Sequence, residues 1–325
     1  LANKTKMGGG AWVRKSLVVF QFFVSIGLLI ATFVVKSQLD YMQNVSLGYD
    51  REQVVALTYH YSMRNVEETM KSEMLRSGAA SSVALAGDMP VHIKAGYTIF
   101  PGGDNEREFM ITGYSTDEDI VKILNLAILA GTDLSKNDLS RSAASESDAL
   151  VPVILNESAV KEMGWNADEA VGKTVNFGFS NATIKAVVGD FYFNSMHEKI
   201  GPLGIFIDQG NANVMLVKIP AGNPSETLAS LEDVWKKFVP ERPFNYRFVD
   251  QEYAQLYRSE ERVGAIFTLF SGIAVFIACM GLFGLVSYVA LRRTREISIR
   301  KVLGATQKDV VSVLASDFLK LLLVA

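Results

Sequence analysis

The sequence predicts a membrane protein in which a large α/β domain outside the cytoplasm is inserted between two transmembrane helices. Three observations predict this fold class. Residues 263–291 hold no charged side chain, and a helix of that length spans about 43 Å, more than the hydrocarbon core of a bilayer. A second apolar run occupies residues 16–35. Bases collect at the outer end of each run, whereas the long stretch between the runs is acidic.

The distribution of charge predicts the topology. Residues 1–36 carry five Lys or Arg and no acid, and residues 292–325 carry seven bases and three acids. The stretch 37–291 carries 20 bases and 32 acids, so the overall net charge of −3 hides a strong asymmetry. Because bases flank transmembrane helices on the cytoplasmic side, both ends are expected in the cytoplasm and residues 37–262 outside it. This pattern indicates a topology, not a nucleic-acid partner.

The first apolar run predicts an uncleaved transmembrane helix over residues 16–36, after a cytoplasmic segment over residues 1–15. Twenty apolar residues suffice to cross the hydrocarbon core. A cleaved signal peptide is the alternative, but the run is long and Lys36-Ser37-Gln38 lacks the small-x-small pattern of a cleavage site. Leu1 in place of Met suggests that the chain is cut from a longer one.

The stretch between the two helices has the pattern of a mixed α/β structure. Residues 53–59 and 214–219 have the composition of strands, and shorter strands are expected at 150–155, 174–179 and 183–188. Apolar residues at helical spacing predict two helices. Their stripes are Met63, Val66, Met70 and Met74 in the first, and Leu228, Leu231, Trp235 and Phe238 in the second. Asn223 and Pro224 mark the start of the second helix. The Ser- and Asp-rich stretch 136–148 is either a subdomain boundary or a solvated connection without function.

The second transmembrane helix is expected over residues 263–291. From Asp250 onward the pattern is helical and contains no proline. If this helix runs straight into residue 263, a continuous rod of about 60 Å would join the outer domain to the cytoplasm. Small residues allow close contacts between helices in lipid. Four glycines of this segment are therefore expected to pack against a partner helix: Gly264, Gly272, Gly281 and Gly284.

The apparent chemical motifs fail on closer inspection, so no catalytic, cofactor or metal site is predicted and the chain is not expected to be an enzyme. Gly172-Lys173-Thr174 is similar to the end of a phosphate-binding loop, but Ala167 stands where the first glycine belongs and a strand pattern follows. A lysine in a turn is the simpler interpretation. The three histidines lie far apart and lack metal-ligand spacing.

An acidic run and a lone cysteine also have simple interpretations. Thr116-Asp117-Glu118-Asp119 is similar to a chelating run, but Thr116 is expected to cap a short helix whose first turn is acidic. Cys279 lies inside the second apolar run, so a disulfide framework is excluded.

The segment after the second helix, residues 292–309, is expected in the cytoplasm. Residues 295–305 have the pattern of a short charged helix ended by Gly304, and Thr306 and Asp309 predict the cap of another helix. Residues 310–325 are hydrophobic again. They are expected to begin a third transmembrane helix, inside which the chain ends.

Several motifs resemble one family of membrane proteins. The run Glu296-Ile297-Ser298-Ile299-Arg300-Lys301-Val302-Leu303-Gly304-Ala305 resembles the signature that follows the second transmembrane helix in MacB/FtsX-type ABC transporter permeases. Two stretches resemble the periplasmic core domain of that family: Val153-Ile154-Leu155-Asn156-Glu157 with Gly164-Trp165, and Val187-Val188-Gly189-Asp190-Phe191 with Ile200-Gly201-Pro202. Residues 14–22 resemble the start of the second half of long, duplicated permeases of this type. The motifs occur in the family's order and cover nearly the whole chain.

The resemblance implies a fold and a contact with a partner. The family has one helix, a MacB-like periplasmic core domain and then three helices, of which this chain holds one and part of another. The core domain is implied to have an α/β subdomain at 37–125 with 213–260, and an inserted, mostly β subdomain at 126–212. In the family the segment after the second helix contacts a separate cytoplasmic ABC ATPase, which implies a coupling role for Glu296, Arg300 and Lys301.

The function implied by the resemblance is mechanical. ATP-driven motion of the ATPase subunit would pass to the domain outside the bacterial inner membrane, for export, efflux or lipoprotein release. Further implied partners are the lipid bilayer, a second permease copy or half, and a periplasmic adaptor or substrate protein. The alternative is a two-helix receptor with an outer sensory domain, against which the third hydrophobic run argues. A membrane-anchored outer enzyme would need a catalytic constellation, which the sequence does not provide.

Overall fold

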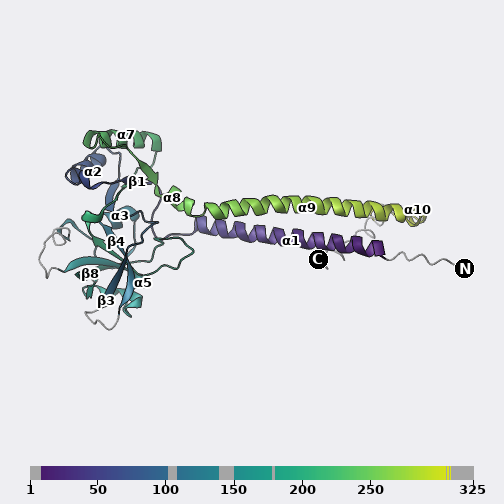
Figure 1. Cartoon of the computed structure of the whole chain (residues 1–325), viewed down its shortest axis with the longest axis horizontal. Helices are drawn as coiled ribbons and strands as arrows, with labels where there is room; N and C mark the ends of the chain where they lie inside the picture. Colours follow the sequence, from purple (N-terminus) through teal and green to yellow (C-terminus); the bar gives the residue numbers. More distant parts are fainter. Residues whose placement is uncertain are drawn as a thin grey trace. The chain divides into compact units, whose positions relative to one another are not determined.

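The computed structural model of the chain (Figure 1) describes residues 9–101, 108–138, 150–177, 180–304, 306 and 308. The chain divides into two compact units. The globular unit is Val45–Leu256, and the helical unit combines Leu1–Asn44 with Tyr257–Ala325. Two expected features lie outside the described residues: the third transmembrane helix at 310–325, and the stretch 136–148 apart from residues 136–138.

The helical unit holds both predicted transmembrane helices. Helix α1 spans Gly9–Asn44, α9 spans Arg258–Arg292 and α10 spans Thr294–Val302. Within them, Ser16–Asn44 and Arg258–Arg292 are long and apolar enough to cross a membrane. Helix α1 runs past the expected end at residue 36, and neither glycine nor proline occurs between residue 36 and Gly48.

The continuous rod predicted from Asp250 into the membrane is wrong. Helix α8 spans Val249–Leu256, and α9 begins only at Arg258. Between them Tyr257 has φ −111° and ψ 11°, outside the range of an α-helix. The sequence offers no glycine or proline at this point. The break instead coincides with a buried tyrosine ring.

All eleven described strands of the globular unit belong to one sheet. The strands of its first part follow the order β11, β1, β10, β2 and β4, and each neighbouring pair is antiparallel. These strands span Tyr246–Phe248, Val54–Thr58, Val214–Lys218, Ser82–Ala86 and Phe109–Thr116. The short helices α3 (Ile120–Leu124), η1 (Tyr61–Met63) and η2 (Gln209–Asn211) lie in its connections.

Two helices share a core with this part of the sheet. They are α2 (Glu67–Arg76) and α7 (Pro224–Phe238). The stripe predicted for the second helix is confirmed, because Leu231 and Trp235 are buried in this core and Leu228 and Phe238 pack against it. The first stripe is confirmed in its second half, since Met70 and Met74 of α2 are buried, whereas Met63 belongs to η1 and Val66 precedes α2. Each such side chain contributes about 1.5–3 kcal/mol through burial. The predicted start of α7 is also confirmed, since the Asn223 side chain accepts a hydrogen bond from the Ser225 N–H at 3.2 Å.

The second part of the sheet closes into a ring. From β4 the order continues through β3, β7, β8, β6 and β9, and β9 pairs in parallel with β4. The added strands span Gly96–Pro101, Thr174–Asn176, Asn181–Val188, Val151–Asn156 and Leu203–Ile207. Strand β5 (Ile128–Gly131) also pairs with β8. Helices α5 (Glu157–Glu162) and α6 (Ala167–Ala170) share a second core with the ring.

The two cores divide earlier in the chain than the boundary expected at residue 126. Ile99 of β3 and Ile111 of β4 belong to the second core, together with Val153, Ile184 and Phe206. The ring can close only if β3 and β4 take part, because β3 pairs with β7 and β4 pairs with β9. Strand β4 therefore serves both parts of the sheet.

Candidate functional site

The segment after α9 forms the short helix that the sequence predicted. Helix α10 begins at Thr294, one residue after α9 is capped by Arg293. The Thr294 hydroxyl lies 2.8 Å from the Leu291 carbonyl and 3.1 Å from the Ala290 carbonyl. Gly304, with φ +92°, follows the helix in a conformation that favours glycine. The segment is thus joined directly to the end of the long membrane helix.

Two of the three predicted coupling residues lie together on α10. The Arg300 guanidinium contacts the Glu296 carboxylate at 2.8 Å, and both side chains are about half exposed. An exposed pair four residues apart on a helix is worth about 0.3–0.5 kcal/mol. Lys301 follows Arg300 on the same helix. Both charged side chains therefore remain accessible at the surface of α10.

Sequence analysis missed the apolar residues of this segment. Ile299 is 56% exposed, Val302 87% and Leu303 80%. Their spacing of three and four residues was the available signal, because such residues share one face of a helix. These apolar side chains are exposed beside the ion pair of Glu296 and Arg300.

The long helices α1 and α9 pack side by side and antiparallel (Figure 1). The less exposed positions recur every seven residues on both helices. On α1 they include Val18, Ser25, Thr32 and Leu39, and on α9 Gly264, Ser271 and Ala278. A repeat of seven residues is the pattern of two helices that pack along their whole length.

The four predicted packing glycines divide into two groups. A Cβ atom on Gly264 would lie 3.2 Å from Leu39 Cδ1 and 3.3 Å from Val35 Cγ1. A Cβ atom on Gly281 would lie 2.7 Å from Gln21 Oε1. Gly272 and Gly284 would meet no described atom within 4 Å. Only the first two glycines therefore lie where α1 approaches α9.

Hydroxyl groups link the two helices at their centre. The Thr32 and Ser271 hydroxyl oxygens are 2.7 Å apart, and the Ser25 hydroxyl donates to the Ala274 carbonyl at 3.2 Å. Ser25 and Ser271 are both buried. Hydrogen bonds of this kind between membrane helices contribute about 0.6 kcal/mol each, with a maximum near 1.7.

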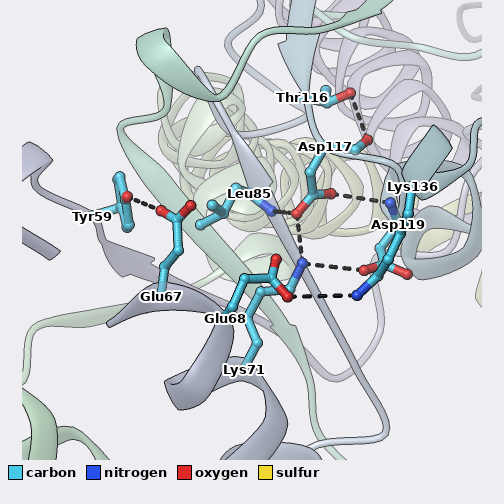
Figure 2. A network of polar contacts seen from close by, with 9 residues as sticks. All are labelled: Tyr59, Glu67, Glu68, Lys71, Leu85, Thr116, Asp117, Asp119 and Lys136. Atoms are coloured by element: carbon cyan, nitrogen blue, oxygen red, sulfur yellow. Dashed lines mark hydrogen bonds and ion pairs between the residues drawn. The ribbon is translucent and has the colours of Figure 1, made fainter. Parts of the chain in front are cut away.

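A buried network of charged groups crosses the globular unit (Figure 2). Lys71 of α2 binds Asp117 at 2.8 Å and Asp119 at 3.1 Å, and Asp117 also accepts the Leu85 N–H at 2.6 Å. Burial opposes the charge of Lys71, but the two carboxylates raise its pKa above the usual range. Nearby, the Tyr59 hydroxyl donates to Glu67, and burial raises the pKa of both groups. The network joins α2 to β2 and to the connection after β4.

The expected cap at Thr116 is wrong. The Thr116 hydroxyl bonds to the carbonyl oxygen of Asp117 at 3.1 Å, and the cap residue of α3 is Asp119, which makes no side-chain capping bond. The Asp117 carboxylate replaces the threonine, because its Oδ1 accepts the Asp119 N–H at 3.1 Å. Asp117 can do this since Lys71 balances its charge inside the protein.

The remaining motif residues have structural roles. Gly172, with φ +84°, turns the chain from α6 into β7, and Lys173 pairs with Glu169 at 2.9 Å while its ammonium group lies 4.2 Å from the centre of the Trp165 ring. Lys173 is thus the turn lysine that the sequence favoured. Among the described residues, no three His, Cys, Asp or Glu side chains are placed to hold a metal ion.

Comparison with known proteins gives a family-model match to the C-terminal part of the chain and a set of similar structures. Residues 268–325 match the family model described as FtsX-like permease C-terminal. The periplasmic region of MacB from Actinobacillus actinomycetemcomitans is similar, with 16% identity and a TM-score of 0.44, over 64% of this chain and 94% of that chain. A domain of a putative permease protein from Porphyromonas gingivalis has 12% identity and a TM-score of 0.37, over 60% and 89%.

The extracellular domain of the noncanonic ABC-type transporter YknZ from Gram-positive bacteria has 14% identity and a TM-score of 0.41, over 60% of this chain and 98% of that chain. Comparison with curated proteins gives no match. The family match covers most of α9 and all of α10, where the sequence signature lies. Two apolar helices flank the large α/β unit. Residues 268–325 are therefore similar to the C-terminal part of FtsX-like permeases.

Proposed function

We propose that the chain is the permease subunit of an ABC transporter and transmits ATP-driven motion from a cytoplasmic ATPase to its globular unit outside the membrane. The observation that carries the proposal is α10, a short helix of mixed charge inside the segment that matches the FtsX-like family. ATP hydrolysis would take place in the ATPase, with Glu296, Arg300 and Lys301 at the contact. The setting would be a bacterial inner membrane, with a second permease copy or half and a periplasmic adaptor or substrate protein as further partners.

The arrangement of the helical unit supports this role. The bases Arg292, Arg293 and Arg295 already supply the positive charge that marks a cytoplasmic helix end. Glu296 adds nothing to such an anchor, because acids contribute little to orientation. A helix that carries both signs of charge, with Ile299 and Val302 exposed beside them, suits a protein partner better than anionic lipid. Movement of α10 would pass directly into α9, since one residue separates them.

A charge swap on α10 tests the proposal. In Glu296→Arg/Arg300→Glu the two side chains can still pair four residues apart, so helix and insertion should be retained while the charges offered to a partner are reversed. Loss of a desolvated interfacial pair costs about 2–5 kcal/mol, which is roughly a 30-fold or greater loss of affinity. We expect the ATPase subunit of the same transporter to dissociate during co-purification from membranes.

The matched control is the swap Glu232→Lys/Lys236→Glu on α7, an exposed pair of the same spacing with a contact of 2.6 Å. This control should retain the ATPase. A swapped α10 that inserts normally and binds the ATPase with unchanged affinity would leave the coupling role without support.

A further inference from the structure

The contact between α1 and α9 raises a question of register. Its packing positions repeat every seven residues on both helices, so sliding one helix by seven residues, about 10 Å, brings similar positions together again. Val18, Leu39, Gly264 and Ala278 are small or apolar and specify little. Apolar packing of this kind leaves register weakly determined, and a polar group at a packing position is the usual device that selects one register.

The hydroxyl groups at the contact between α1 and α9 distinguish the observed register from the one displaced by seven residues. In the structure Thr32 contacts Ser271 at 2.7 Å, and Ser25 donates to the Ala274 carbonyl at 3.2 Å. A slide of one repeat would bring Thr32 opposite Gly264, which offers no side-chain partner. The same slide would bring Ser271 opposite Ser25 in place of Thr32. The two buried serines would then face each other, so Thr32 is the residue that loses its interhelical partner and keeps the bond to the Leu28 carbonyl of its own helix, at 2.8 Å.

We propose that Ser25, Thr32 and Ser271 are positioning residues that fix the register of α1 against α9. The mechanical consequence rests on the function proposed above. Both helices continue into the globular unit through the chain, α1 at Asn44 and α9 through Tyr257. If the two helices could slide past each other, α9 could move along its axis without moving α1. A fixed register makes the pair a single moving body.

Disulfide trapping in membranes carrying the full chain tests the register directly. In a Cys279→Ser background, Leu39→Cys with Gly264→Cys reports the observed register, because Leu39 reaches within 3.2 Å of a Cβ at position 264. Leu28→Cys with Phe267→Cys reports a slide of one repeat. The first pair should cross-link readily on mild oxidation and the second only at background. Adding Thr32→Val and Ser271→Ala should lower the first yield at least threefold and raise the second.

Two further variants separate register from general damage. Thr32→Ser with Ser271→Thr keeps both hydroxyls and should restore the parent pattern. Thr268→Val removes a hydroxyl of α9 that bonds only to the Gly264 carbonyl of its own helix, at 2.8 Å, and should change neither yield. An unchanged pattern in Thr32→Val/Ser271→Ala, or an equal loss in Thr268→Val, would overturn the proposal. The measurement needs no ATPase, so its failure is distinct from failure of the coupling function.

Discussion

Replacing Lys71 with methionine should expose how much the globular unit depends on its buried charges. The lysine side chain is 6% exposed and that of Asp117 0%. Methionine keeps most of the aliphatic length of lysine and removes the ammonium group. Asp117 would then retain only the Leu85 and Asp119 N–H groups as partners, at 2.6 and 3.1 Å.

The expected loss is large because a carboxylate would remain buried without its counter-ion. Breaking a buried ion pair by removing one partner typically costs about 3–5 kcal/mol. Lys71→Met should therefore lower the free energy of unfolding at pH 7.5 by about 3 kcal/mol or more. Lys71→Met/Asp117→Asn should recover part of this loss, since the amide oxygen still accepts the Leu85 N–H and no buried charge remains, while the amide NH2 group then faces the Asp119 N–H without an acceptor. The second partner, Asp119, is 34% exposed and can be hydrated.

The loss should depend on pH in a defined direction. Burial raises the pKa of Asp117 from 3.8 to about 6, and Lys71 opposes this rise. Without Lys71 the pKa of Asp117 rises further, so the folded variant holds a proton that the unfolded chain releases above about pH 4. Stability then falls as pH rises through the folded pKa. Lys71→Met should thus be less destabilised relative to the parent protein at pH 5 than at pH 8.

Urea unfolding of a separately produced Val45–Leu256 unit provides the assay. Trp235 is buried in the core that α2 shares with α7, so in a Trp165→Phe background its fluorescence reports the relevant unfolding. Parent, both single variants and the double variant form a double-mutant cycle at pH 5, 6.5 and 8. A loss below about 1 kcal/mol at pH 7.5, or a loss that grows as the pH falls, would refute the reasoning.

Two further predictions concern the membrane. Gly264→Leu should weaken the α1–α9 contact because its side chain would meet Leu39 and Val35, whereas Gly272→Leu should be tolerated by this contact; cross-linking between α1 and α9 compares them. A reduction equal in both variants would contradict the assignment. For topology, Tyr61→Cys, at a site 73% exposed, should react with an impermeant maleimide from outside intact cells, and Val302→Cys, at a site 87% exposed, only after permeabilisation. The reverse pattern would contradict the predicted orientation.

The features predicted correctly from the sequence are those with a local signal. Charge-free length predicted both membrane helices, and helical spacing predicted the buried faces of α2 and α7. Pairing between distant segments leaves no such signal. Nothing near Thr32 indicates Ser271, and nothing near β4 indicates that β9 pairs with it in parallel. The break at Tyr257 was missed for a related reason, because it coincides with a buried ring and not with glycine or proline.

In the globular unit, the motifs that resemble the permease family contain residues whose hydrogen bonds stabilise the fold. Asn156, which is fully buried, accepts the Ala159 N–H at 3.0 Å and the Leu203 N–H at 2.8 Å, and donates to the Gly201 carbonyl at 2.9 Å. One side chain thus starts α5 and fixes the approach to β9. Asp190 binds the Ser158 N–H and hydroxyl at 2.9 and 2.7 Å. Several buried polar groups depend on each of these two residues for a hydrogen-bond partner.

The first residues of the globular unit are bonded to the segment after β8, to α3 and to β10. The Tyr192 N–H donates to the Leu47 carbonyl at 2.8 Å, and Gly48, with φ +81°, packs against Asp190 and Phe191 beside the ring. Two residues later, the Asp50 N–H donates to the Leu124 carbonyl of α3 at 2.8 Å, and the Asp50 side chain binds Lys218 of β10. The chain that leaves α1 is therefore bonded, within four residues, to the segment after β8, to α3 and to β10. Under the function proposed above, a displacement of α1 would reach all three through these bonds.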